Sequence, residues 1–119
     1  MTLPACPSTP NCVSSDADDP RRIVAPLAFG ERTAEAWSLL LELLTDLPRV
    51  ELVERTDTTA HAVFTTRLLR FRDDLHLELR DGRGEIAVRS ASRVGHWDLG
   101  TNRRRVEGLR RQLSSLLEG

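Results

Sequence analysis

The sequence has no lysine, only two cysteines, few aromatic residues and no long apolar run. Its 17 basic residues are therefore all arginines. Genome base composition explains that bias most simply, although planar guanidinium groups also suit two-pronged pairing with carboxylates or phosphates. Without an apolar stretch of about 20 residues the chain has no candidate membrane span, and its first residues lack the basic and apolar regions of a secretory signal. We therefore expect a cytoplasmic protein without a membrane segment.

Charge is nearly balanced, since 18 acidic residues give the chain a formal net charge of -1. No strong overall field draws such a chain to nucleic acid, and we expect no nucleic-acid partner. A length of 119 residues with 39% hydrophobic residues suits one compact core. Four of the six prolines fall in residues 1–20, which predicts an irregular N-terminal arm packed on a single domain over residues 21–119.

Both cysteines, Cys6 and Cys12, lie in that arm. Their five-residue gap differs from the two-residue spacing of zinc knuckles and thioredoxin-type centres, so we expect no metal site and no cofactor. A local disulfide or two separately packed thiols are both compatible with the spacing. A catalytic thiolate would further require a nearby base or cation.

Helical periodicity marks two segments. One starts after Thr33, a good N-cap, and ends at Pro48; the other starts near Thr101 or Asn102 and runs toward the C-terminus. Their apolar stripes are expected to comprise Trp37, Leu40, Leu41, Leu44 and Leu47 in the first, and Val106, Leu109, Leu113, Leu116 and Leu117 in the second.

Four segments between the helices alternate in the manner of strands: 50–55, 60–69, 71–80 and 85–90. Closing the last hairpin at Asp81 and Gly84 pairs Arg80 with Glu85, Leu79 with Ile86, Leu77 with Val88 and His76 with Arg89. Residues 21–27 allow at best a short edge strand. The sequence thus predicts a two-layer α+β fold, in which a curved antiparallel sheet of four to five strands packs against two helices in a helix-grip-like arrangement with a long C-terminal helix.

The junction from the last strand to the last helix is rich in polar residues. Three arginines, Arg103 to Arg105, stand at a helix start, where the macrodipole disfavours cations. Two explanations remain open: an anionic ligand held by guanidinium and backbone N–H groups, or an internal ion network in which Asp98 and Glu107 neutralise the arginines. The predicted ligand-binding residues are Arg89, Ser92, Arg93, Asp98, Asn102, Arg103 and Arg105.

A second polar cluster comprises Asp73, Asp74, His76 and Glu78. Alternate residues of a strand stand about 7 Å apart, which suits cross-strand ion pairs better than shared metal ligation. We expect a solvated face or ion pairs with Arg89 and Arg67.

Three motifs together resemble domain-of-unknown-function family 1499. They are Cys6-Pro-x-x-Pro-Asn-Cys-Val-Ser-Ser15, Phe71-x-Asp-Asp74 and Arg89-Ser-x-Ser-Arg-x-Gly-x-x-Asp-x-Gly-x-Asn-Arg-x-Arg-Val-Glu-x-Leu-Arg110. The resemblance implies no activity that could be carried over. It implies shared polar positions that add supporting residues to the junction, namely Asn11, Ser14, Asp74 and Glu107. His96-Trp97 departs from the family pattern. The three motifs lie far apart in sequence, and a family pattern that includes all of them is explained most simply if they meet in space. We therefore expect the arm to cross the junction.

These observations favour a noncatalytic binding module for an anionic small molecule or an acidic peptide segment. Two alternatives stay open. An assembly or scaffold module would present a flat apolar patch, and a thiol-dependent enzyme would use Cys6 or Cys12 beside the arginines.

Overall fold

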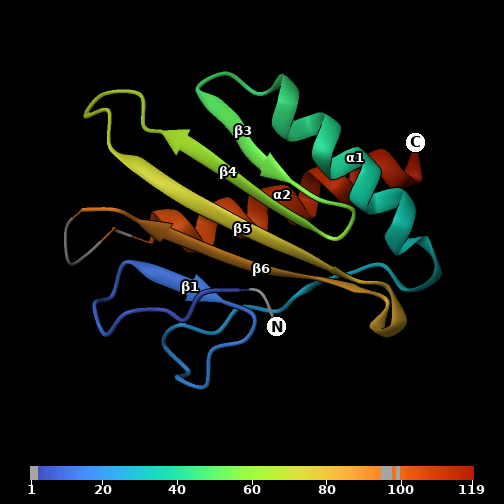
Figure 1. Cartoon of the computed structure of the whole chain (residues 1–119), viewed down its shortest axis with the longest axis horizontal. Coiled ribbons are helices and arrows are strands. Elements are labelled where there is room, and N and C mark those ends of the chain that lie inside the picture. Colours follow the sequence, from blue (N-terminus) through green and yellow to red (C-terminus); the bar gives the residue numbers. More distant parts are fainter. Residues whose placement is uncertain (1–2, 95–97, 99) are drawn as a thin grey trace.

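The structure, a computed structural model, describes residues 3–94, 98 and 100–119. Within these residues, six strands form one open antiparallel sheet on which two α-helices pack (Figure 1). The strands are β1 (Cys12–Ser14), β2 (Leu27–Ala28), β3 (Val50–Arg55), β4 (Thr59–Thr65), β5 (Arg72–Arg80) and β6 (Glu85–Ser92), and the helices are α1 (Thr33–Asp46) and α2 (Thr101–Glu118). The order across the sheet is β1-β6-β5-β4-β3, and β2 pairs with the other end of β6. The α+β class predicted from the sequence is confirmed.

The β5–β6 hairpin has the register that alternation predicts. All four expected pairs are present, from Arg80 with Glu85 to His76 with Arg89. Gly84 closes the turn in a left-handed conformation with φ of 64°, and a Cβ there would lie 2.9 Å from the Cα of Gly30. Only glycine fits both demands without strain.

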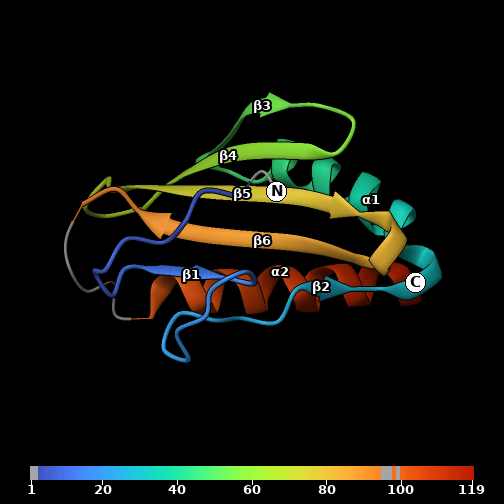
Figure 2. The same ribbon diagram turned by 60° about the horizontal axis from the view of Figure 1, so that its bottom comes forward.

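One face of the sheet carries the core. Both helices contribute to a single hydrophobic cluster with the inward side chains of β4, β5 and β6. Helix α2 runs along β5 and β6, behind them in Figure 1 and beneath them in Figure 2. The buried side chains include Leu40 and Leu44 of α1, Leu75 and Leu77 of β5, Ile86 and Val88 of β6, and Val106, Leu109 and Leu113 of α2. Leu116 of the predicted stripe is 49% exposed and does not belong to this core.

The predicted strand over residues 60–69 was too long. Thr66 and Phe71 close the β4–β5 hairpin, since the Phe71 N–H donates to Thr66 Oγ1 and the Thr66 N–H donates to the Phe71 carbonyl, both at 2.8 Å. Arg70 then takes a positive φ of 60°, so the chain turns instead of extending. Leu68 and Leu69 in this loop are 88% and 70% exposed.

The arm is more regular than its prolines suggest. Its residues Cys12–Ser14 form β1, which pairs with β6 at the edge of the sheet. A disulfide joins Cys6 to Cys12, so residues 7–11 form a closed loop beside this edge. No helix in the described part of the chain is long and apolar enough to span a bilayer.

Candidate functional site

Side chains of β6 alternate between the two faces of the sheet, which divides the predicted site. Ser90 and Ser92 point to the helix-covered face, where they contact α2. Arg89 and Arg93 point to the opposite face, where Arg93 meets Asp74. The seven predicted ligand-binding residues therefore do not form a single cluster.

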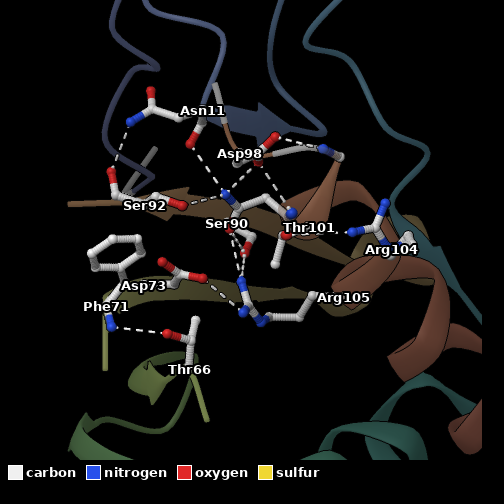
Figure 3. A network of polar contacts seen from close by, with 12 residues as sticks. Asn11, Thr66, Phe71, Asp73, Ser90, Ser92, Asp98, Thr101, Arg104 and Arg105 are labelled. Atoms are coloured by element: carbon white, nitrogen blue, oxygen red, sulfur yellow. Dashed lines mark hydrogen bonds and ion pairs between the residues drawn. The ribbon is translucent and has the colours of Figure 1, made fainter. Parts of the chain in front are cut away.

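On the helix-covered face, Arg105 of α2 pairs with Asp73 of β5, whose residue is 1% exposed (Figure 3). The Arg105 Nη2 group donates to Asp73 Oδ2 at 2.8 Å, and Nη1 donates to Ser90 Oγ at 3.1 Å and Asn102 Oδ1 at 2.8 Å. Its guanidinium also lies 4.6 Å from the ring centre of Phe64, a cation–π geometry. Arg105 is thus engaged by internal partners.

Asn102 is the hub of this network and is fully buried. Its Nδ2 group shares two N–H bonds among three acceptors, Asp98 Oδ2 at 2.7 Å, Ser92 Oγ at 2.9 Å and the Asn11 carbonyl at 3.2 Å. Asn11 in turn donates from its side chain to the Ser92 carbonyl at 3.0 Å. These contacts confirm that the arm crosses the junction.

The sequence predicts Asp98 either as a ligand-binding residue or as an ion-pair partner of the arginines. In the structure it caps α2 instead. Its carboxylate accepts the N–H groups of Gly100 at 2.8 Å and Asn102 at 3.2 Å, so it caps α2 in place of Thr101 or Asn102. Gly100 takes a left-handed φ of 76° at the N-cap, which brings the carboxylate over the helix start. No ion pair links Asp98 to an arginine among the described residues.

The opposite face carries a histidine pair beside a salt bridge. Arg93 donates twice to Asp74, both at 2.9 Å, and His61 Nε2 lies 2.7 Å from Asp74 Oδ1. The Arg93 hydrogen bonds lower the pKa of Asp74 to about 2, with a further contribution from His61. The expected partners, Arg89 and Arg67, are not the ones that Asp74 takes.

His76 stacks on His61 with ring centres 4.2 Å apart. Burial lowers the pKa of His76 to about 4, and the nearby charges of His61 and Arg89 act in the same direction. Arg89 donates to the Ala5 carbonyl at 3.3 Å, and burial also lowers its pKa. Ala5, just before the first cysteine, therefore lies over this face.

Remaining junction residues hold the arm and the segment that follows it. Arg103 donates to the carbonyls of Ile23 at 3.0 Å and Arg21 at 3.1 Å. Glu107 pairs with Arg110 at 2.9 Å, not with the arginines at the helix start. Ser14 accepts the Asp16 N–H at 3.1 Å and shapes the turn after β1. His96 and Trp97 lie outside the described residues.

Two hollows flank the start of α2. The first, which we name the arm cleft, has a volume of about 360 Å³, and its lining includes Ser8, Cys12, Arg21, Arg22, Asp98 and Arg103. The second, which we name the loop hollow, has a volume of about 740 Å³, and its lining includes Leu68, Leu69, Phe71, Asp73, Ser92 and Val94. Both volumes fall in the range of small-molecule sites.

Asp73 is the important residue absent from the predicted site. It stands two residues before Leu75, so alternation places its carboxylate on the apolar face. A charge on that face needs a buried partner, and the arginines at the helix start supply one. The sequence thus indicates a buried carboxylate at Asp73, although the fold determines which arginine pairs with it.

The described residues contain no group of three or more His, Cys, Asp or Glu side chains that could hold a metal ion. Fold and site together define an α+β domain with an open antiparallel sheet, an arm stapled at the sheet edge and a polar hub beneath it. Residues 2–113 match the family model described as a protein of unknown function (DUF1499), and the chain belongs to that family. Neither the curated proteins nor the solved structures gave a match.

Proposed function

We propose that the protein is a noncatalytic binding module whose arm cleft takes an anionic small molecule. The observation that carries this proposal is the charge around the cleft. Arg21, Arg22 and Arg103 contribute three positive charges to its lining, whereas Asp98 contributes one negative charge. Asp19, which pairs with Arg21 and Arg22, brings the negative charges near the cleft to two. The excess positive charge favours a carboxylate or phosphate ligand.

The arginines retain donors for such a ligand. Arg103 uses one hydrogen bond on each terminal nitrogen to hold backbone carbonyls, and each terminal nitrogen carries a second N–H. The Arg21 side chain is 84% exposed, and its recorded contacts are to its neighbour Asp19. The start of α2 adds the partial positive charge of a helix N-terminus.

The proposal narrows the ligand-binding set predicted from the sequence. Arg103 and Asp98 line the arm cleft, whereas Arg89 and Arg93 are on the opposite face of the sheet. Asn102 acts indirectly, because it holds the Asn11 carbonyl of the arm against the junction, and Arg105 supports it by donating to the Asn102 side chain. An acidic peptide segment is the alternative ligand for the same arginines.

A thiol-dependent enzyme has less support. Its mechanism needs a thiolate, whereas both sulfurs share the disulfide and Cys12 is 2% exposed. An assembly module would use an exposed apolar patch. Leu68, Leu69, Phe71 and Val94 form such a patch at the loop hollow, on the other side of the α2 start.

The arm-cleft proposal is tested by titrating ¹⁵N-labelled protein with inorganic phosphate and with succinate. We expect saturable shifts of the amides of Ser8, Val13 and Gly100. Arg21→Gln should weaken binding roughly tenfold, because a charge-assisted hydrogen bond is lost, without disturbing the carbonyls that Arg103 holds.

Arg111→Gln is the matched control, since it removes the same charge from an exposed position on α2 outside the cleft. It should leave the affinity unchanged. Equal weakening by both variants would mean nonspecific charge attraction and would overturn the proposal, as would the absence of saturable shifts.

A further inference from the structure

We propose that the loop hollow is a second binding site, which takes an apolar small molecule carrying a neutral N–H donor. The hollow lies between the β4–β5 loop and the start of α2, and it does not share the arginines of the arm cleft. Both linings include Asp98, so the two sites are tested independently by variants at other residues.

The first observation is an unpaired buried oxygen. Asp73 gives Oδ2 to Arg105, but Oδ1 has no hydrogen-bond donor among the described residues although it is buried. Figure 3 shows this oxygen pointing away from Arg105, toward the side where Phe71 lies. A buried carboxylate oxygen without a donor is costly, so a ligand N–H that reached it would recover that cost.

The second observation is the apolar wall around that oxygen. Leu68, Leu69, Phe71 and Val94 line the hollow and are 88%, 70%, 45% and 54% exposed. Large apolar side chains gathered at one concave place mark interaction sites. The flat body of a small aromatic molecule would bury them while its polar edge faces Asp73.

The charges around the hollow determine whether the hydrogen-bond donor of the ligand is charged or neutral. Arg105 already neutralises Asp73 at 2.8 Å, so a cationic ligand would add a buried charge without compensation. An anionic ligand would meet two carboxylates, Asp73 and Asp98, against one guanidinium, that of Arg67, in the lining of the hollow. A neutral N–H donor avoids both penalties.

Phe71 lines the hollow on the side to which this oxygen points (Figure 3). Its residue precedes Asp73 by two positions, so the two side chains project to the same side of the chain. Because the Phe71 side chain is half exposed, a change of its rotamer does not disturb the core. A ligand bound in the hollow would pack against this ring.

The experiment compares indole with 1-methylindole, which has the same aromatic body but no N–H. Titration of ¹⁵N-labelled wild type should shift the amides of Leu68, Leu69 and Ser92, and indole should bind roughly tenfold more tightly, as expected for a hydrogen bond to a carboxylate. Equal affinity for the two probes would overturn the proposal, and so would the absence of shifts at these amides.

Two variants sharpen the test. Asp73→Asn keeps a carbonyl oxygen for Arg105 and turns an NH₂ group toward the hollow, so the preference for indole should disappear. Leu69→Ser should weaken both probes, whereas Leu116→Ser, at an exposed leucine on α2 outside the hollow, should weaken neither. If the wild type forms a dimer that Leu69→Ser dissociates, and indole shifts no amide signals, this face is an interface between copies of the chain. That outcome would overturn the proposal.

Discussion

Two neighbouring side chains on one face of β5 both have lowered pKa values and resist protonation over different pH ranges. Asp74 and His76 are two residues apart, and both contact His61. Hydrogen bonds from Arg93 keep Asp74 ionised down to a pKa of about 2. Burial keeps His76 neutral down to a pKa of about 4. Their effects on stability therefore fall in different pH ranges.

Replacing His76 by glutamine should flatten the pH dependence of stability between pH 6.5 and pH 4. The folded pKa of His76 is about 4, against 6.5 for an unperturbed histidine. Between these values the unfolded state binds more protons, so the free energy of unfolding of the wild type falls as the pH is lowered. Urea denaturation of both proteins at several pH values measures the difference.

The carboxylate next to the pair provides an internal check on that experiment. Asp74 has a lowered pKa, so its contribution is present above about pH 4 and is lost as the pH falls toward about 2. It therefore adds little slope between pH 6.5 and pH 4. Parallel curves for wild type and His76→Gln across that interval would contradict the assigned pKa shift.

The N-terminal end of α2 lies under the arm. A helix leaves its first N–H groups without internal partners, and here Asp98 accepts two N–H groups near the N-terminus while Asn102 fixes its carboxylate from the side. The Asn102 side chain thereby links the start of α2 to both β6 and the arm. Arg103 and Arg105 are tolerated near this helix start because their partners, the Ile23 carbonyl and the Asp73 carboxylate, lie on neighbouring segments.

Asp98→Ala should lower the free energy of unfolding by about 1–2 kcal/mol, the usual cost of losing a helix cap. Asp98→Asn, which keeps one carbonyl oxygen as an acceptor, should cost less. Asp18→Ala removes an exposed aspartate whose side chain has no partner within the described part of the chain, and it should change stability by less than about 0.5 kcal/mol. Urea denaturation at pH 7 ranks the three variants, and equal losses for Asp98→Ala and Asp18→Ala would exclude the capping role.

At the scale of the whole molecule, local patterns were predictable and distant partners were not. Alternation and the turn at Gly84 set the β5–β6 register, because a shift of one residue would turn Leu75 and Leu77 away from the core. Alternation also implies that Arg89 and Arg93 lie opposite Ser90 and Ser92, although the crowding of polar residues at the junction suggested a single site.

The parts that could not be predicted depend on contacts between distant segments. β1 has three residues, too few for a periodic signal, and its pairing with β6 is supported by tertiary contacts. Asn102 donates to Asn11, 91 residues away. Local spacing carries no information about which amide or carboxylate a distant arginine or asparagine meets.

The disulfide should therefore stabilise the arm as a unit of the molecule. It closes a loop with a sequence separation of 6 between Cys6 and Cys12, for which loop-closure entropy gives about 2 kcal/mol. Cys6→Ser should cost about that much in urea denaturation, and reduction of the wild type should reproduce the loss. Because the Ser92 amide donates to the Asn11 carbonyl at 2.9 Å, its hydrogen exchange should accelerate more than that of Leu77 in the central hairpin. Equal acceleration at both amides would show that the disulfide acts on the unfolded chain alone and does not hold the arm on β6.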